Sequence, residues 1–218
     1  MIRYRSSSTA ILLAAALLVS CSSGSREVTP TVPAYTPDED QSTSAAAEPS
    51  ESATATDGPL TAEGLSDPAA EYTVSAIPED LDETQTAVLR GYMAYDRATW
   101  DAYRAMDGDL SRVQAASTGD AWSTYRTEYQ SAQDAGASMT GRYDLDIKFV
   151  SPVTPGDIFA TVSVCADQSA IAMVNPSGAD VTPETMRHRL GQDYMLELDD
   201  DSGSWQVSSW TEATRDKC

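Results

Sequence analysis

The sequence predicts an α+β domain in which helices come first along the chain and an antiparallel sheet follows. Apolar residues recur at helical spacing between about residues 80 and 135, and after Gly136 they alternate with polar residues. All four tryptophans fall after residue 78, so the hydrophobic core is expected there. We therefore predict one domain over residues 78–218, with helices packed on one face of a curved sheet.

The helical part is expected to begin with a long helix. Asp80 or Asp82 would cap this helix, which runs to about Met106, and shorter helices are expected over 110–116 and 121–135. Two apolar rows follow the long helix, one with Leu81, Val88, Tyr92 and Tyr95 and the other with Leu89, Met93, Trp100 and Tyr103. Such rows predict a helix buried against other elements.

The second half of the chain predicts five strands. In the first of them, aromatic and aliphatic side chains alternate with charged ones, which is typical of a half-buried strand. An acidic turn over 199–203 separates the last two strands, and we interpret it as a hairpin turn rather than a calcium loop. The predicted strands span residues 143–149, 158–165, 170–174, 185–198 and 205–211.

The N-terminus is typical of a bacterial lipoprotein signal peptide. Arg3 and Arg5 precede an uncharged run from Thr9 to Val19, and the sequence Leu-Val-Ser-Cys ends at Cys21. The run has about 11 residues, whereas a membrane-spanning helix needs about 20. We predict that residues 1–20 are removed and that acylated Cys21 anchors the chain at the extracytoplasmic face of the cell membrane. The alternative is an ordinary secretory signal that is cut before an incidental cysteine.

Residues 21–77 are predicted to form a disordered acidic tether. They consist mainly of Ser, Thr, Ala, Pro, Glu and Asp, and they cannot bury enough apolar surface to offset the loss of backbone entropy. Like charges and prolines extend such a segment, which then acts as a spacer or is plain low-complexity sequence.

Only two of the 14 basic residues are lysines, Lys148 and Lys217, which is typical of an actinobacterial proteome.

The charge balance argues against a nucleic-acid partner. The chain has 34 acidic and 14 basic residues, a formal net charge of −20. Such a chain repels phosphate backbones, and no basic patch interleaved with aromatic residues is present in the sequence.

Two further cysteines, Cys165 and Cys218, are predicted to form a disulfide. Exported chains meet oxidising conditions, and two cysteines can pair. The bridge would close a loop of roughly 53 residues and stabilise the fold by about 4 kcal/mol in the chain-entropy model. A redox pair or two free thiols are the alternatives, but the sequence has no C-x-x-C spacing for exchange chemistry.

The sequence contains no recognisable catalytic motif. His188 is the only histidine, so H-E-x-x-H zinc chemistry is excluded, and no G-x-S-x-G, S-x-x-K or G-x-G-x-x-G sequence occurs. We predict no metal and no cofactor.

The order of elements resembles the NTF2-like (SnoaL-like, cystatin-like) cone domains of small actinobacterial lipoproteins. The resemblance covers about residues 80–218 and is carried by the helix with Tyr92, Tyr95 and Trp100, by Gly-Ser-Trp-Gln-Val at 203–207, and by the two cysteines. It implies a sheet wrapped around the long helix, with a pocket at the open end. It also implies a homodimer formed through the exposed face of the sheet. The family includes isomerases, cyclases, dehydratases and non-catalytic partners, so the fold does not decide the function.

Four residues are candidates for lining such a pocket: Tyr92, Asp96, His188 and Tyr194. Asp96 lies between the two apolar rows, and His188 alternates with apolar residues on the expected inward face of its strand. A desolvated carboxylate beside an imidazole could transfer a proton. Alternatively, Asp96 lies at the helix edge, bonded to solvent or an arginine, and His188 is a satisfied core or rim residue.

Three functions remain open from the sequence. The first is a non-catalytic binding or accessory module for another protein of the cell envelope. The second is a carrier that holds a small apolar ligand in the cone. The third is an enzyme similar to SnoaL or ketosteroid isomerase that uses Asp96 and His188 as its catalytic residues.

Overall fold

The computed structural model describes residues 60–218. The predicted signal peptide, Cys21 and most of the predicted tether lie outside the described residues. The described part contains three short helical segments, three longer helices and seven strands. They are α1 (Ala62–Leu65), η1 (Pro68–Ala70), β1 (Tyr72–Ala76), α2 (Glu83–Ala105), α3 (Ser111–Ala116), α4 (Gly119–Asp134), β2 (Ser138–Gly141), β3 (Tyr143–Val150), β4 (Phe159–Asp167), β5 (Ile171–Val174), η2 (Glu184–Met186), β6 (Arg189–Asp199) and β7 (Ser204–Arg215).

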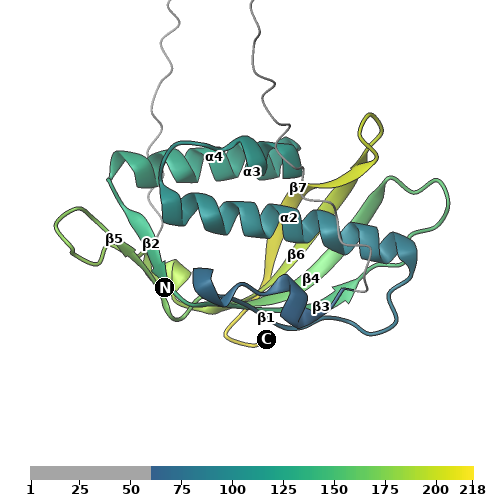
Figure 1. Ribbon diagram of the computed structural model, residues 1–218, viewed down its shortest axis with the longest axis horizontal. Helices are drawn as coiled ribbons and strands as arrows, with labels where there is room; N and C mark the ends of the chain where they lie inside the picture. Colours follow the sequence, from purple (N-terminus) through teal and green to yellow (C-terminus); the bar gives the residue numbers. More distant parts are fainter. Residues whose placement is uncertain (1–59) are drawn as a thin grey trace, which may run out of the picture. The chain divides into compact units, whose positions relative to one another are not determined.

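Five strands form the main sheet in the order β1-β3-β4-β6-β7, and β2 pairs with β5 in a separate two-stranded sheet. The β1–β3 pair is parallel and all other pairs are antiparallel. Irregularities in the β3–β4 and β6–β7 pairings bend the main sheet, as β-bulges do. Figure 1 shows α2, α3 and α4 on one face of this sheet. The predicted α+β class, with helices packed on a curved antiparallel sheet, is confirmed.

Helix α2 is the long predicted helix, and its start has a clear local cause. The Asp82 side chain accepts a hydrogen bond from the backbone N–H of Gln85, and the Gln85 side chain accepts one from the Asp82 N–H. The helix ends at Met106, which has a left-handed backbone with φ 47°. Both apolar rows of the sequence face the sheet and the other helices, and this face carries Val88, Leu89, Tyr92, Met93, Tyr95 and Trp100.

A close approach of helix and sheet fixes the position of α2. A side chain at Gly91, in the middle of the helix, would overlap the backbone and Cβ of Trp205 in β7. The absence of a side chain at Gly91 therefore lets α2 lie directly against β7. Leu196 and Val207, which are fully buried, belong to the core beneath the helix.

The predicted boundary after residue 77 is wrong, because residues 60–77 belong to the domain. Strand β1 adds to the edge of the main sheet, and its Tyr72 is fully buried. Arg97 of α2 forms an ion pair with Asp67, and the Trp100 indole N–H donates to the Ala70 carbonyl at 2.9 Å. Tyr72 and Val74 alternate with polar residues, as a short strand requires, but they stand in a stretch whose composition is otherwise that of the tether.

The strand that was predicted from residue 185 begins later, at Arg189. Residues Glu184–Met186 form η2 instead, and His188 precedes the strand. The alternation of side chains therefore cannot be extended from β6 back to residue 188.

The short strand β2 was not predicted, because its four residues, which include a glycine, are too few to show a period.

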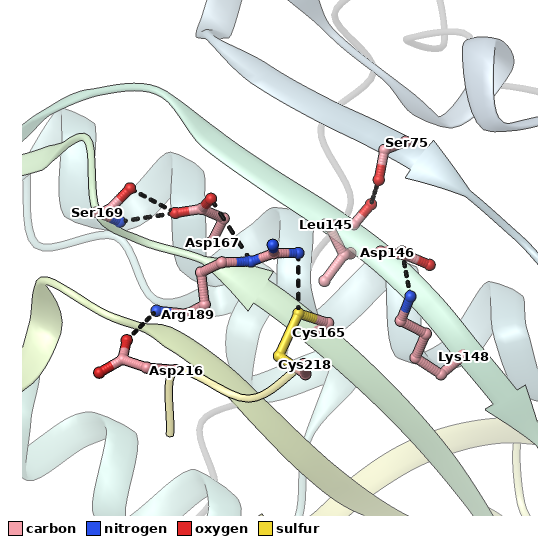
Figure 2. Close-up of a disulfide and its surroundings, with 10 residues drawn as sticks. All are labelled: Ser75, Leu145, Asp146, Lys148, Cys165, Asp167, Ser169, Arg189, Asp216 and Cys218. Atoms are coloured by element: carbon pink, nitrogen blue, oxygen red, sulfur yellow. Dashed lines mark hydrogen bonds and ion pairs between the residues drawn. A yellow bond between two sulfur atoms is a disulfide. The ribbon is translucent and has the colours of Figure 1, made fainter. Parts of the chain in front are cut away.

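The predicted disulfide between Cys165 and Cys218 is present, with the two Cα atoms 5.6 Å apart. Cys165 lies in β4 opposite Gly191 of β6, and the Cys218 Cβ would contact a side chain at Gly191. The bridge thus joins the C-terminal residue to β4 across β6. Figure 2 shows the Arg189 guanidinium beside the bridge, where it donates to the Cys165 Sγ at 3.5 Å.

Candidate functional site

A cavity of about 640 Å³ lies between α2, α4, the β2–β5 sheet and the ends of β6 and β7. Seven aromatic side chains line it, together with aliphatic and methionine side chains from the strands and from the segment before β6. The aromatic side chains are Tyr95, Trp100, Tyr103, Tyr125, Tyr143, Tyr194 and Trp210. The apolar ones include Ala132, Met139, Ile171, Met173, Val181 and Leu190. A cavity of this size and lining is typical of a binding site for a small molecule.

One wall of the cavity contains a buried carboxylate that three tyrosine hydroxyls surround. Asp96 is 6% exposed. Tyr72 donates to its Oδ2 at 2.6 Å, while Tyr143 and Tyr92 donate to its Oδ1 at 3.1 and 3.2 Å. Asp96 and Tyr143 both line the cavity. We call Asp96 with Tyr72, Tyr92 and Tyr143 the tyrosine–aspartate cluster.

The local structure explains why these four side chains meet. Tyr92 lies four residues before Asp96 on α2, so both are on the same face of the helix. Tyr72 and Tyr143 are paired in the parallel β1–β3 register, and their ring centroids are 5.5 Å apart. Two neighbouring strands therefore present their hydroxyls side by side to one position of α2.

Burial controls the protonation of the cluster. Removal from water raises the pKa of the Asp96 carboxyl, although the hydrogen bonds from the three tyrosines act in the opposite direction. Burial, followed by the negative charge of Asp96, raises the pKa of Tyr72, Tyr92 and Tyr143 well above 10. The tyrosines therefore remain neutral hydrogen-bond donors at physiological pH, and the carboxyl takes up a proton more readily than an exposed aspartate.

A second polar pair lies on the β6 side of the cavity. Tyr194 donates to the Oε1 of Gln192 at 3.1 Å, and both residues line the cavity and are at least nine-tenths buried. Among residues 60–218, no protein group accepts a hydrogen bond from the Gln192 amide nitrogen, and this nitrogen is not fully buried. Gln192 therefore offers a hydrogen bond to a molecule in the cavity.

The predicted pairing of Asp96 with His188 is wrong. His188 is not part of the cavity wall, and its Nδ1 lies 2.9 Å from the Oδ2 of Asp216 near the C-terminus. His188 is instead half-buried, and Asp216 is the hydrogen-bond partner of its ring nitrogen. The corresponding alternative for Asp96, a helix-edge position bonded to solvent or arginine, is also wrong, because tyrosine hydroxyls are its partners.

Of the predicted pocket residues, Asp96 and Tyr194 line the cavity, and Tyr92 reaches it only through its bond to Asp96. Tyr72, Tyr143 and Gln192 were not predicted as site residues. The inward position of Tyr143 could have been found from the alternation in β3. Tyr72 could not, since its segment was assigned to the tether.

Residues 60–218 contain no cluster of three or more His, Cys, Asp or Glu side chains placed to hold a metal ion. In the same part of the chain, no helix is long and apolar enough to cross a membrane.

Comparison with known proteins gives distant structural similarities. No protein family and no curated protein matches the chain. Among solved structures, a ketosteroid isomerase-like protein from Erwinia carotovora atroseptica is similar, with 17% sequence identity and a TM-score of 0.42. The match covers 62% of this chain and 99% of that protein. At this identity, the similarity assigns no role to any residue of the cavity.

Replacement of Asp96 by asparagine tests the cluster. We expect Asp96→Asn to destabilise the protein by about 2 kcal/mol, because an amide nitrogen would face hydroxyl donors that have lost an acceptor. The folded-state pKa of Asp96 is raised above its ordinary value of 3.8, so its stabilising contribution is full below pH 3.8 and is lost as the pH rises through the raised pKa. The difference in the free energy of unfolding between the wild type and the variant should therefore decrease from acid to neutral pH. Urea unfolding at several pH values measures it.

Asp109→Asn is the matched control for this pH dependence. Hydrogen bonds from Ser111 lower the pKa of the exposed Asp109 carboxyl. The contribution of Asp109 is therefore present at neutral pH and lost as the pH falls, with the opposite sign. Parallel pH profiles for the two variants would contradict the assignment of a desolvated carboxyl to Asp96.

Proposed function

We propose that this protein is a ligand-binding module of the cell envelope, with a small, largely apolar molecule held in the cavity of its cone. The observation that supports this most strongly is the cavity of about 640 Å³, whose wall carries seven aromatic rings and several aliphatic side chains, with Asp96 and Gln192 as its buried polar groups. Pockets that bind small molecules have this volume and this mixture of side chains.

The geometry favours ligand binding over catalysis. The acid–base pair considered from the sequence does not form, because His188, the only histidine, is bonded to Asp216 outside the cavity wall. Both oxygens of Asp96 already accept hydrogen bonds from tyrosines. A carrier or sensor requires only that a ligand fill the cavity. Such a ligand-binding function is compatible with an accessory role beside another envelope protein.

We assign the domain to the NTF2-like superfamily as part of this proposal. Its support is the order of elements, with the long helix α2 before the bulged strands β3, β4, β6 and β7, and the cavity that α2 lines. A homodimer formed through the outer face of the sheet is the partner arrangement that this assignment implies, and sedimentation of the purified protein would test it.

We also propose that acylated Cys21 holds the protein at the extracytoplasmic face of the membrane, with residues 22–59 as the tether. Its support is the sequence Leu-Val-Ser-Cys after a short apolar run. The wild type should partition into the detergent phase of Triton X-114, whereas Cys21→Ser should enter the aqueous phase. Equal partitioning of both proteins would reject the lipid anchor.

Filling the cavity should abolish ligand binding. Full-length protein with Cys21→Ser, which carries no acyl chain, is expected to bind the neutral fluorescent probe N-phenyl-1-naphthylamine. Ala132→Phe places a ring in the cavity wall and should weaken binding at least about tenfold, since a phenyl group occupies a large part of the site. Ala94→Phe, on the exposed face of α2, is the control and should leave binding unchanged.

Native mass spectrometry supplies a second readout. Protein isolated gently from its own cells should carry a bound small molecule, which organic extraction releases, and Ala132→Phe should carry less of it. Unchanged probe binding by Ala132→Phe, with a folded circular dichroism spectrum, would show that the cavity is not the binding site.

A further inference from the structure

The charges around the cavity are unbalanced. Three carboxylates line it, Asp96, Glu128 and Glu212, against one cation, Arg215. Arg215 donates to both oxygens of Glu212, at 3.0 and 2.7 Å, so these two charges offset each other. Asp96 is surrounded by hydroxyls and contributes mainly a negative potential. Within residues 60–218, the Glu128 carboxylate has no cationic partner.

Glu128 stands next to the aromatic wall. It follows Tyr125 by three residues on α4, and its negative charge contributes, after burial, to the raised pKa of Tyr103 and Tyr95. Partial burial also raises the pKa of the Glu128 carboxyl itself. The Glu128 side chain is exposed by its accessible surface, so its carboxylate lies where the cavity wall meets solvent and attracts a cation that enters.

The aromatic rings favour the same kind of ligand. The rings of Tyr103 and Tyr125 are packed edge to face, with centroids 5.3 Å apart and an interplanar angle of 71°. Tyr95 and Trp100 extend this aromatic wall along α2. The face of each ring is electron-rich and attracts ammonium groups, and quaternary ammonium ligands are commonly bound by such groups of rings.

We propose that the cavity binds a lipophilic cation, a molecule with an ammonium group on an apolar body. The ammonium group lies beside Glu128 and the rings of Tyr95, Tyr103 and Tyr125, and the apolar body extends toward Met139 and Ile171. This inference rests on the proposed ligand-binding function and specifies the charge of the ligand. A fatty acid or another anion is disfavoured, because the unpaired Glu128 and the buried Asp96 repel it.

Three probes of matched chain length test the inference: decyltrimethylammonium, 1-decanol and decanoate. Calorimetric titrations use the full-length protein with Cys21→Ser, below the concentration at which the probes aggregate. We expect the cation to bind about tenfold more tightly than decanol, and decanoate to bind most weakly. Glu128→Gln should weaken binding of the cation about fivefold and leave decanol unchanged. The matched control Glu63→Gln, on the exposed face of α1, should change neither.

The outcomes separate this inference from the function on which it rests. If decanol or decanoate binds as tightly as the cation, or if Glu128→Gln and Glu63→Gln act alike on the cation, the cavity binds apolar ligands but the cationic assignment is overturned. If none of the three probes and no naphthylamine probe binds, the proposed ligand-binding function itself fails, and the inference fails with it.

Discussion

A chain that begins at residue 78 is expected to lose cooperative folding, whereas a chain that begins at residue 60 should keep it. The missing segment contains Tyr72, which is fully buried and donates to Asp96 at 2.6 Å. It also contains the Ala70 carbonyl, which accepts a hydrogen bond from the Trp100 indole. Its removal exposes the edge of β3, takes from Asp96 the one donor to its Oδ2, and leaves the Trp100 indole N–H without its acceptor.

The expected loss in the free energy of unfolding is large compared with the total stability of a domain. Truncation of a buried aromatic side chain costs about 3–5 kcal/mol, and each buried polar group left without a partner costs about 1–3 kcal/mol more. Domains are stable by only about 5–15 kcal/mol. Urea unfolding followed by tryptophan fluorescence and near-ultraviolet circular dichroism measures the effect. Equal midpoints for the chains starting at residues 60 and 78 would show that β1 is dispensable.

Loss of the disulfide should be the second largest effect. The double variant Cys165→Ala/Cys218→Ala frees a loop with a sequence separation of 53 residues. The chain-entropy model gives about 4 kcal/mol for such a loop, which corresponds to a decrease of roughly 10 °C in the Tm of a domain of this size. Differential scanning calorimetry measures the decrease.

Two controls accompany this experiment. The wild type in reducing agent should unfold at the temperature of the double variant, since both lack the bridge. Cys21→Ala should unfold at the temperature of the wild type, because its cysteine lies outside the bridge. A reduced wild type that keeps its full Tm would show that the bridge adds nothing to stability, although it joins the C-terminal residue to β4.

The fold was largely predictable because its signals are local. The capping residue Asp82 and the apolar rows of α2 are visible in any window of the sequence, and the structure places them as expected. The pairing of Cys165 with Cys218 followed from the number of cysteines and the expected export of the chain. These inferences need no knowledge of which elements become neighbours.

The site was less predictable because it depends on neighbours that are distant in sequence. Asp96 was recognised as unusual, but its partners Tyr72 and Tyr143 come from two strands that become parallel neighbours only in the fold. His188 was misplaced because alternation was extended beyond the start of β6. A period shows which side a residue faces within a strand, and it gives no information outside that strand.

The parallel pairing of β1 with β3 also has a consequence for how the chain avoids aggregation. Three helices separate the two strands in sequence, so β1 is expected to join the sheet late, after local elements have formed. Until then, β3 is an open edge to which another chain could add. Asp144, Asp146 and Lys148 alternate along this strand, and charged side chains on an edge discourage such addition. The charged positions of β3 therefore protect the folding chain during the interval before β1 covers the edge of the sheet.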